Sequence, residues 1–429
     1  MLAQSLSDDI VSYILSIPRF SKDKHSMEDL RRFLSRLGDP HIGKKIIHVA
    51  GTNGKGSVCA YLHGIFIASG IKTGLFTSPH LVSMRERIKI NKHIATEDEF
   101  ASAFTMVKEN ITDFHPTFFE FLFLMAMVIF GKKNVECIIL ETGLGGRLDA
   151  TNVLENKDLT IITPISYDHM EVLGSTLREI ANEKAGIMRP GIPLVTSWQQ
   201  IGVWALLMDK ASAYNSQIVV IDNNAIKINK IRIKSIDFSY QYRYDIVVRA
   251  ILPTKALYQI ENASLAIHSA LIFNDERISV ETIKRGLEKT VWPGRLEDMG
   301  SGVIFDGAHN KDGIRAFISE AIFNNCRGRK FLLFGGVKEK QTKEMITICK
   351  NAKIFTWMVA CPVANPRTLK INDLLAFFRP EQVFDDVKSG LSYLLDHKEP
   401  EDIIFVTGSL YLYHEVKLLL EKKPRFTDD

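Results

Sequence analysis

The ten residues from His48 to Ser57, HVAGTNGKGS, constrain the fold most, because they join an apolar segment to a helical one through a glycine-rich turn. The strand predicted for 45–50 is short and rich in β-branched residues, which is typical of a buried parallel strand. Three glycines in the turn let backbone N–H groups approach an anion, and the helix predicted for 58–68 would direct its positive end toward that anion. The pattern predicts an α/β fold with a P-loop.

Two side chains within this loop favour nucleotide binding over the alternative of a plain glycine-rich turn. Lys55 can reach the outer phosphates, and the hydroxyl of Ser57 can bind a magnesium ion. In the usual P-loop pattern the hydroxyl residue directly follows the lysine, whereas here Gly56 lies between them. The loop therefore departs from the general pattern while keeping its chemical groups.

Composition is that of an ordinary globular protein, with 54 basic and 50 acidic residues among 429 and a net charge of +4. This length predicts two domains, and the balanced charge gives no reason to expect a nucleic-acid partner. The five cysteines lack CxxC spacing, so we expect neither disulfides nor a zinc site, and a reducing cytoplasm fits best. The longest apolar run, 118–130, is too short to span a membrane, and no leader sequence is recognisable.

Polar residues follow other predicted strands, where ligands bind in open α/β sheets. The strand predicted for 135–140 ends in Glu141, which opens the segment ETGLGGRLDATN and could bind a metal ion or its water. Arg147 and Asp149 of this segment could hold a polar ligand or, in an ordinary loop, pair with each other. Another predicted strand is followed by Ser78, whose hydroxyl would lie beside the phosphates. The alternative is that Ser78 only forms a serine-proline turn at the end of that strand.

Two nitrogen-bearing side chains are further candidates. His169 follows the strand predicted for 159–165, and a neutral imidazole with an adjacent aspartate is a common metal ligand, although a lone histidine there is more often structural. Lys184 lies in the helix predicted for 176–187. From the residues alone, Lys184 is expected to be a solvated lysine beside Glu183.

A second α/β unit is predicted after the Pro-Gly turn near Arg295, which marks a domain boundary between residues 1–294 and 295–429. Strands alternate with helices in this smaller, Rossmann-like domain. It lacks GxGxxG, so no dinucleotide is implied. Its first strand ends in DGAHN, which begins at Asp306. The strands predicted for this domain are 303–305, 330–334, 355–360 and 403–406.

Several motifs resemble those of one family. GTNGKGS resembles the ATP loop of the Mur ligase superfamily, and its folylpolyglutamate synthase and dihydrofolate synthase branch has motifs similar to TSPHL, LGGRLDATN, EKAGI, ENASLAI, WPGRLE and DGAHN. The resemblance covers essentially the whole chain and is most specific over 48–187. Thr142 stands where the family often has valine, and Lys311 where it often has proline.

The resemblance implies an ATP-dependent ligase that adds L-glutamate to a folate-type carboxylate through an acyl phosphate, in folate biosynthesis and one-carbon metabolism. It implies ATP as co-substrate, two magnesium ions and an N6-carboxylysine at Lys184. The implied partners are small molecules alone, namely ATP, L-glutamate and a folate or dihydropteroate, and we expect a monomer without nucleic acid or membrane.

The resemblance also assigns residues to roles. The implied ATP-binding residues are Thr52, Asn53, Gly54, Lys55, Gly56, Ser57, Asn262, Arg295, Asp306 and His309. The implied metal ligands are Ser57, Ser78, Glu141, His169 and Lys184, and the implied catalytic residues are Lys55, His169 and Lys184. The implied folate-binding residues are Thr117, Phe118, Phe119, Glu120, Leu148, Asp149 and Ala150, with part of a pterin site at Lys24, His25, Ser26 and Met27.

Two other functions remain open at this point. A sister Mur ligase that adds amino acids to a nucleotide-sugar precursor shares the phosphate loop and the reaction, but LGGRLDATN and TSPHL favour the folate branch. A nucleotide-gated binding module would share the loop without ligase turnover.

Overall fold

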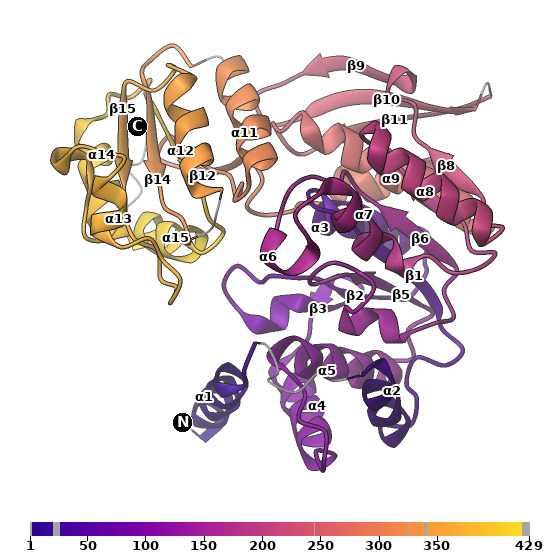
Figure 1. Ribbon diagram of the computed structural model, residues 1–429. Coiled ribbons are helices and arrows are strands. Elements are labelled where there is room, and N and C mark those ends of the chain that lie inside the picture. The colour runs from indigo at the N-terminus through magenta and orange to yellow at the C-terminus, as the bar shows by residue number, and fades with distance from the viewer. Residues whose placement is uncertain (1, 20–25, 244, 325, 339–340, 423–429) are drawn as a thin grey trace. The chain divides into compact units, whose positions relative to one another are not determined.

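The computed structural model describes residues 2–19, 26–243, 245–324, 326–338 and 341–422. The chain divides into two compact units, which are described separately below (Figure 1). The first unit comprises Met1–Pro253 and Gln259–Thr290, and the second comprises Thr254–Tyr258 and Val291–Asp429. A short internal segment, Thr254–Tyr258, is therefore part of the second unit although its neighbours in sequence are not.

An eight-stranded sheet lies at the centre of the first unit. Its strands are β1 (Lys45–Ala50), β2 (Thr73–Phe76), β3 (Ile88–Ile90), β4 (His93–Ile94), β5 (Cys137–Glu141), β6 (Leu159–Ile162), β7 (Leu194–Thr196) and β8 (Ile218–Val220). Their order is β4-β3-β2-β5-β1-β6-β7-β8, and all pairs from β2 to β8 are parallel. The carboxyl ends of β5, β1 and β6 therefore lie next to one another at one edge.

The helices of this unit begin at caps that can be recognised in the sequence. Thr96, Thr117 and Thr176 each form a capping box with a glutamate three residues later. The helices are α1 (Leu2–Ser16), α2 (Met27–Arg36), α3 (Lys55–Ala68), α4 (Glu97–Glu109), α5 (Phe118–Lys132), α6 (Met170–Leu173), α7 (Leu177–Lys184), α8 (Ile201–Ala213), α9 (Tyr258–Phe273) and α10 (Val280–Lys289). The 3-10 turns are η1 (Met84–Arg87), η2 (Ala150–Val153), η3 (Ala185–Ile187) and η4 (Asn223–Ala225).

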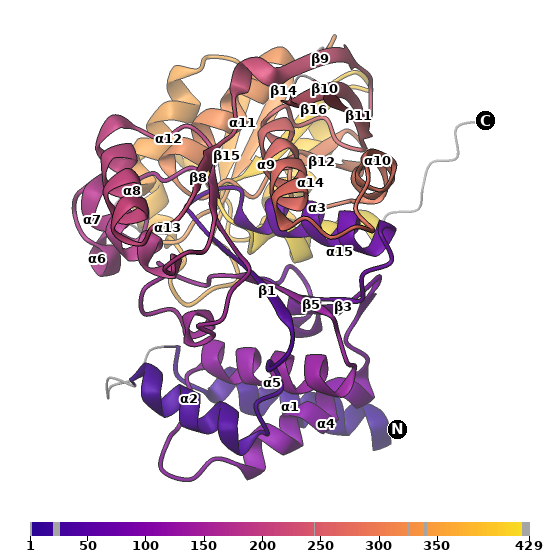
Figure 2. The same cartoon turned by 90° about the vertical axis from the view of Figure 1, so that its right-hand side faces the viewer.

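Helices cover both faces of the eight-stranded sheet. Figure 2 shows α1, α2, α4 and α5 gathered on one side of β1, β3 and β5, whereas α3 lies on the other side. Helix α10 packs directly on α3, where a Cβ at Gly286 would lie 2.5 Å from the Cα of Ile65. Close contact between these two helices therefore depends on glycine.

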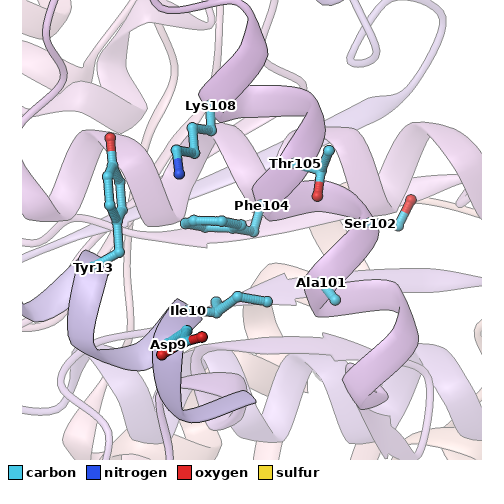
Figure 3. Close-up of a pocket in the computed structure, with 8 residues that line it drawn as sticks. All are labelled: Asp9, Ile10, Tyr13, Ala101, Ser102, Phe104, Thr105 and Lys108. Carbon is cyan, nitrogen blue, oxygen red and sulfur yellow. The ribbon is translucent and has the colours of Figure 1, made fainter. Parts of the chain in front are cut away.

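A pocket of about 430 Å³ lies between α1 and α4 (Figure 3). The ammonium of Lys108 lies 4.6 Å from the ring centre of Tyr13 and 5.4 Å from that of Phe104. None of the site residues predicted from the sequence lines this pocket. Its lining residues are Asp9, Ile10, Tyr13, Ala101, Ser102, Phe104, Thr105 and Lys108.

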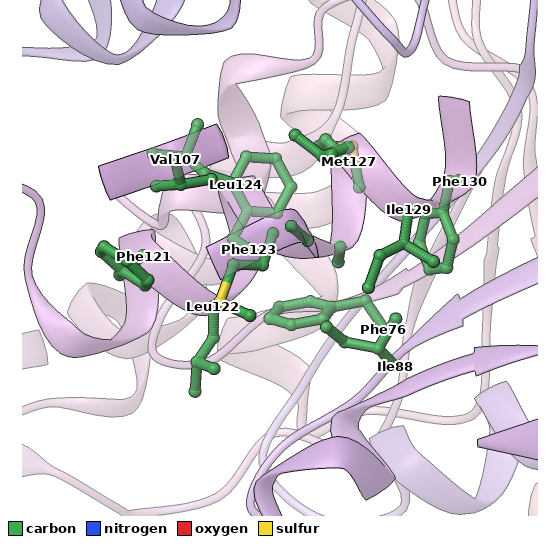
Figure 4. Close-up of a cluster of buried hydrophobic side chains, with 14 of the residues drawn as sticks. Phe76, Ile88, Val107, Phe121, Leu122, Phe123, Leu124, Met127, Ile129 and Phe130 are labelled. Carbon is green, nitrogen blue, oxygen red and sulfur yellow. The ribbon is translucent and has the colours of Figure 1, made fainter. Parts of the chain in front are cut away.

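The largest core of the first unit surrounds α5, whose residues from Phe121 to Phe130 are all buried (Figure 4). This helix is apolar on every side because it packs against the sheet through Phe76 and Ile138 and against α4 through Val107. No helix among the residues described has both the length and the apolar character needed to cross a membrane. The segment is thus a core helix.

The region 190–240 contains a helix as well as strands. Residues Ile201–Ala213 form a helix, α8, because Val203, Leu207 and Ala211 recur at helical spacing and are buried together. The strands that follow β8 form a separate antiparallel sheet in the order β11-β10-β9. These strands are β9 (Ile226–Ile231), β10 (Ile236–Arg243) and β11 (Ile246–Leu252).

The second unit contains a five-stranded sheet, and the predicted α/β class is confirmed. The strands are β12 (Glu297–Gly300), β13 (Val303–Phe305), β14 (Lys330–Phe334), β15 (Trp357–Ala360) and β16 (Ile403–Thr407). Their order is β12-β13-β16-β14-β15, with only β12 antiparallel to its neighbour. The helical elements are α11 (Lys311–Phe323), α12 (Thr342–Asn351), α13 (Ile371–Leu375), η5 (Pro380–Gln382), α14 (Val387–His397) and α15 (Leu412–Lys422).

Glu320 on α11 is a buried carboxylate of this second unit. Its Oε1 accepts the N–H of Tyr258 at 3.2 Å. Burial raises the pKa of Glu320 from 4.5 to about 7, although hydrogen bonds from the backbone of Tyr258 and Leu257 oppose the rise. Because the pKa is higher in the folded chain than in the unfolded one, the free energy of unfolding falls as pH rises from 4.5 to about 7, and it levels off above that range.

Glu320→Gln should remove this loss of stability, because the amide keeps an acceptor oxygen but cannot ionise. We expect the difference in thermal midpoint, variant minus wild type, to be roughly 5 °C larger at about pH 8 than at about pH 4.5. Thermal unfolding of both proteins across this range measures the effect. A difference between the two proteins that does not change with pH would contradict the raised pKa.

Candidate active site

The phosphate loop, residues 51–57, turns so tightly that two of its positions require glycine. Gly51 has a φ of +142° and Gly54 a φ of +91°. A Cβ at Gly51 would lie 1.8 Å from Oγ1 of Thr163, and a Cβ at Gly54 would lie 2.3 Å from Oδ1 of Asn262. The loop is therefore held against the segment that follows β6 and against α9.

Lys55 is the first residue of α3, so this helix starts earlier than the predicted Val58. The reason is that Gly54 already caps the helix in a left-handed conformation. The Nζ of Lys55 donates to the main-chain oxygens of Gly51 at 3.2 Å and Thr52 at 3.1 Å. Its positive charge and the first N–H groups of α3 thus lie at the same loop, where they can stabilise an anion.

Lys184 also binds the phosphate loop, through an Nζ that donates to the oxygen of Gly51 at 2.7 Å. Its side chain is only 3% exposed. Burial and the nearby charge of Lys55 lower the pKa of Lys184 to about 7, against the opposing effect of two aspartates. The expectation of a solvated lysine beside Glu183 is wrong, because the end of α7 packs against the loop.

The glycine-rich segment after β5 is fixed by separate partners of its arginine and its aspartate. Arg147 donates from Nε and Nη2 to Oε1 of Glu183 at 3.0 and 2.9 Å. Asp149 accepts the N–H groups of Leu144 at 2.8 Å and Thr151 at 3.0 Å, and burial raises the pKa of Asp149. The alternative in which Arg147 and Asp149 pair with each other is therefore wrong.

Candidate oxygen ligands lie at the carboxyl edge of β2 and β5 and in the first turn of α3. Glu141 ends β5 with 3% exposure, and its Oε2 accepts the N–H of Ser78 at 2.8 Å. Ser57 is also buried. Carboxylate and hydroxyl oxygens suit magnesium, so these donors fit the implied ion. Among the described residues no cluster of three His, Cys, Asp or Glu could hold a metal.

His169 caps α6 with a φ of +49°. Its N–H donates to Oδ1 of Asp168 at 2.9 Å, and its Nε2 lies 3.8 Å from the same oxygen. The main-chain bond fixes the turn at His169, and orientation of the imidazole by the adjoining aspartate stays a prediction. A protonated lysine has no lone pair to offer a metal ion, so Lys184 fits a metal site only in the form of a carbamate.

The folate-binding candidates lie at the start of α5 and in the segment after β5. Thr117 and Glu120 form a capping box in which Oε2 of Glu120 accepts the N–H of Thr117 at 2.7 Å. Glu120 thus lies at the helix rim and has a partner. The guanidinium carbon of Arg87 lies 5.4 Å from the ring centre of Phe118, and the ring of Phe119 lies 5.5 Å from that of Phe76.

The remaining folate candidates differ in exposure. Leu148 is 67% exposed, which is unusual for a large apolar side chain, whereas Asp149 and Ala150 are buried. Lys24 and His25 of the predicted pterin segment lie outside the described residues. Ser26 of the same segment caps α2, with its Oγ accepting the N–H of Asp29 at 3.1 Å.

Asn262 lies on α9 and contacts the phosphate loop through Gly54. Its Nδ2 donates to Oε1 of Gln259 at 2.9 Å, which fixes the orientation of the amide. The structure thus brings together the phosphate loop, Lys184 and Asn262, three features that lie far apart in sequence.

Three predicted ATP-binding residues, Arg295, Asp306 and His309, lie together in the second unit. The Nη1 of Arg295 donates to the oxygen of Gly294 at 2.9 Å, and a Cβ at Gly307 would lie 2.7 Å from that Nη1. Nδ1 of His309 lies 2.9 Å from the oxygen of Gly307. Asp306 is buried at the end of β13.

Two residues that sequence reasoning missed, Gln199 and Tyr258, form hydrogen bonds to parts of the candidate site. Gln199 accepts the N–H of Ile165 at 3.0 Å and donates to the oxygen of Thr163 at 3.3 Å, and so braces the segment that packs on Gly51. Tyr258 donates to Asp306 at 2.6 Å. The sequence signals were weak: Gln199 follows a short strand, and Tyr258 stands just before the ENASLAI motif.

The chain is similar to known proteins over nearly its full length. Residues 294–410 match the family described as Mur ligase, glutamate ligase domain. The chain is 31% identical over 419 residues to the dihydrofolate synthase/folylpolyglutamate synthase of Bacillus subtilis, covering 93% of this chain and 95% of the relative. It is 30% identical to the folylpolyglutamate synthase of Lacticaseibacillus casei, with 96% and 98% covered.

Solved structures agree with these relatives. An FPGS complex with AMPPCP and folate superposes with a TM-score of 0.85 at 29% identity, covering 96% of this chain and 99% of that one. Escherichia coli FolC in complex with DHPP and ADP also gives 0.85, at 26% identity with 97% of each chain covered. Sequence identity of this level along nearly the full length of both chains shows that the protein belongs to the folylpolyglutamate synthase and dihydrofolate synthase family of ATP-dependent ligases.

Proposed function

We propose that this protein uses ATP to join the amine of L-glutamate to a carboxylate of a folate-type acceptor. A carboxylate oxygen of the acceptor attacks the terminal phosphorus of ATP, which forms an acyl phosphate and releases ADP. The glutamate amine then attacks the acyl carbon and loses a proton as phosphate leaves. The observation that carries this proposal is the phosphate loop, where Lys55 and the buried Lys184 both bind the oxygen of Gly51.

The loop's contribution to this reaction is electrostatic. Negative charge accumulates on the oxygens of the transferring phosphoryl group, and positive groups held in place before the reaction lower its barrier. Lys55 supplies a full charge, and the N-terminus of α3 supplies backbone N–H groups and the positive end of its dipole. No nucleophilic side chain of the protein is required, since the acceptor carboxylate is itself the nucleophile.

Magnesium would complete the charge balance of the site. We assign one ion to Ser57, Ser78 and Glu141, and a second to His169 and a carbamylated Lys184. Bound magnesium would shield the phosphate oxygens from the attacking carboxylate. The buried carboxylate of Glu141, held by the N–H of Ser78, supports the first assignment.

The position of the Lys184 amine supports the carbamate that we propose there. A neutral lysine amine attacks carbon dioxide, forms an N–C bond and loses a proton, and the product is an anionic carbamate. A pKa of about 7 leaves a large share of this amine neutral near pH 7. The carbamate would also replace a positive charge beside Lys55 with a negative one, which removes the repulsion between the two lysines.

The other assignments concern the nucleotide and the acceptor. We assign Asn262, Arg295, Asp306 and His309 to ATP, with residues 1–294 as the ATP-binding domain and 295–429 as the glutamate ligase domain, which the match over 294–410 supports. The rings of Phe118 and Phe119 and the exposed Leu148 offer apolar surface to a pterin, beside Thr117, Glu120, Asp149 and Ala150.

Product mass after incubation with ATP and L-glutamate tests the proposal. Addition of one glutamyl residue to dihydropteroate, to a folate monoglutamate or to both would identify the acceptor. Product from a nucleotide-sugar carboxylate alone would show that the protein has the activity of the sister branch of Mur ligases. ATP binding without product from any acceptor would favour the binding module.

Lys55→Ala should lower ligation by at least roughly 100-fold, because the charge it removes serves the phosphoryl group and not the core. The thermal midpoint should stay near that of the wild type. Lys45→Ala is the matched control, since Lys45 starts the preceding strand and pairs with Asp158 at the surface, 2.7 Å away. Equal activity of the two variants would show that Lys55 has no role in the reaction.

Lys184→Ala should lose most activity, and Lys184→Arg should be no better, because arginine keeps the positive charge and does not form the carbamate. Removal of carbon dioxide at mildly acidic pH should lower wild-type activity, and bicarbonate should restore it. After equilibration with carbon-13 bicarbonate, an NMR signal of a protein carbamate should appear in the wild type and be absent from both variants.

A second buried lysine provides the control for this experiment. Lys157 donates to Oδ1 of Asn152 at 2.7 Å and to the oxygen of Ile187 at 2.8 Å. Lys157→Ala should lose stability and yet keep both the response to bicarbonate and the carbamate signal. Full activity of Lys184→Arg would show that Lys184 is not a metal ligand.

A further inference from the structure

The carboxylate of Asp306 is held by hydrogen bonds from three parts of the second unit. Its Oδ1 accepts the N–H of Ala308 at 2.9 Å, within its own turn. Its Oδ2 accepts the N–H of Leu296 at 3.0 Å and the hydroxyl of Tyr258 at 2.6 Å. Tyr258 is the only one of the three that binds through its side chain, and it is 48 positions away in sequence.

Tyr258 is itself fixed in place from the other side. Its main-chain N–H donates to Oε1 of Glu320 at 3.2 Å. The segment Thr254–Tyr258 belongs to the second unit, so the tyrosine and Asp306 are parts of one compact body. Burial raises the pKa of the Tyr258 phenol far above its ordinary value, so the phenol stays protonated as a donor.

The orientation of Asp306 also decides the position of its neighbours. Gly307 lies against Arg295 and Leu410 so closely that a Cβ would be 2.7 Å from Nη1 of the arginine and 2.1 Å from Cδ2 of the leucine. A rotated carboxylate would release the N–H groups of Leu296 and Ala308, which flank Arg295 and Gly307. Burial raises the pKa of Asp306, and the phenol of Tyr258 opposes that rise, because it hydrogen-bonds the ionised carboxylate.

We propose that Tyr258 is a positioning residue for ATP, which acts by holding the carboxylate of Asp306 through the bond from its hydroxyl to Oδ2. The inference rests on the proposed role of Asp306 in ATP binding. Tyr258 does not contact the reacting atoms; it fixes the side chain that contacts the nucleotide. A hydrogen bond to a buried charged group has a larger effect than one between neutral groups, so loss of one hydroxyl should be measurable.

Tyr258→Phe tests the proposal because it removes the hydroxyl and keeps the ring. We expect the KM for ATP to rise roughly tenfold, with a smaller change in kcat and no change in the KM values for L-glutamate and the acceptor. Tyr240→Phe is the matched control, since the buried hydroxyl of Tyr240 lies 2.6 Å from Nδ1 of His268 in the first unit. This control should lower stability to a similar extent and leave the KM for ATP unchanged.

A double-mutant cycle shows whether Tyr258 acts through Asp306. In an Asp306→Asn background, Tyr258→Phe should have little further effect on ATP affinity. Equal fold-changes in both backgrounds, an unchanged KM for ATP, or a rise in all three KM values would overturn the proposal.

ADP binding by calorimetry separates this inference from the proposed function. If the wild type fails to ligate any acceptor, the proposed function fails, while weaker ADP binding by Tyr258→Phe would still support the positioning role. If the wild type ligates and the variant binds ADP equally well, the positioning role fails and the proposed function stands.

Discussion

The close approach of separate chain segments around the main-chain oxygen of Gly51 is the constraint on which the first unit depends. This one oxygen accepts hydrogen bonds from both Lys55 and Lys184, and Gly51 leaves no room for a Cβ beside Thr163. On the opposite side, Gly54 leaves none beside Asn262. Because each contact excludes even a methyl group, the loop, the end of β6, α7 and α9 must be placed together.

This packing is electrostatically unfavourable. A role in catalysis accounts for it better than a contribution to stability does. Burial of a lysine is unfavourable unless its charge is compensated, and Lys184 lies within the field of a second lysine. The nearby Asp149 is buried as well, with a raised pKa. Perturbed groups collected at the carboxyl edge of a parallel sheet are typical of catalytic sites.

Other acidic residues near this edge have structural roles that local chemistry accounts for. Glu120 closes a capping box with Thr117, and Glu183 holds Arg147 through two hydrogen bonds. In the second unit, Asp306 accepts three hydrogen bonds from its own surroundings. A carboxylate in a family motif can thus hold the backbone in shape as well as serve a ligand, and the two roles are compatible because a carboxylate has several acceptor positions.

The sequence by itself determined the elements whose signals are local. The glycine turn before Lys55 and the apolar strands of the eight-stranded and five-stranded sheets depend on neighbouring residues, so they could be predicted. The tertiary structure alone decided that Lys184 is buried and not solvated, that Arg147 binds Glu183 and not Asp149, and that Tyr258 reaches Asp306. The physical reason is that burial and pairing depend on segments brought together from distant parts of the chain, where the spacing of nearby residues carries no information.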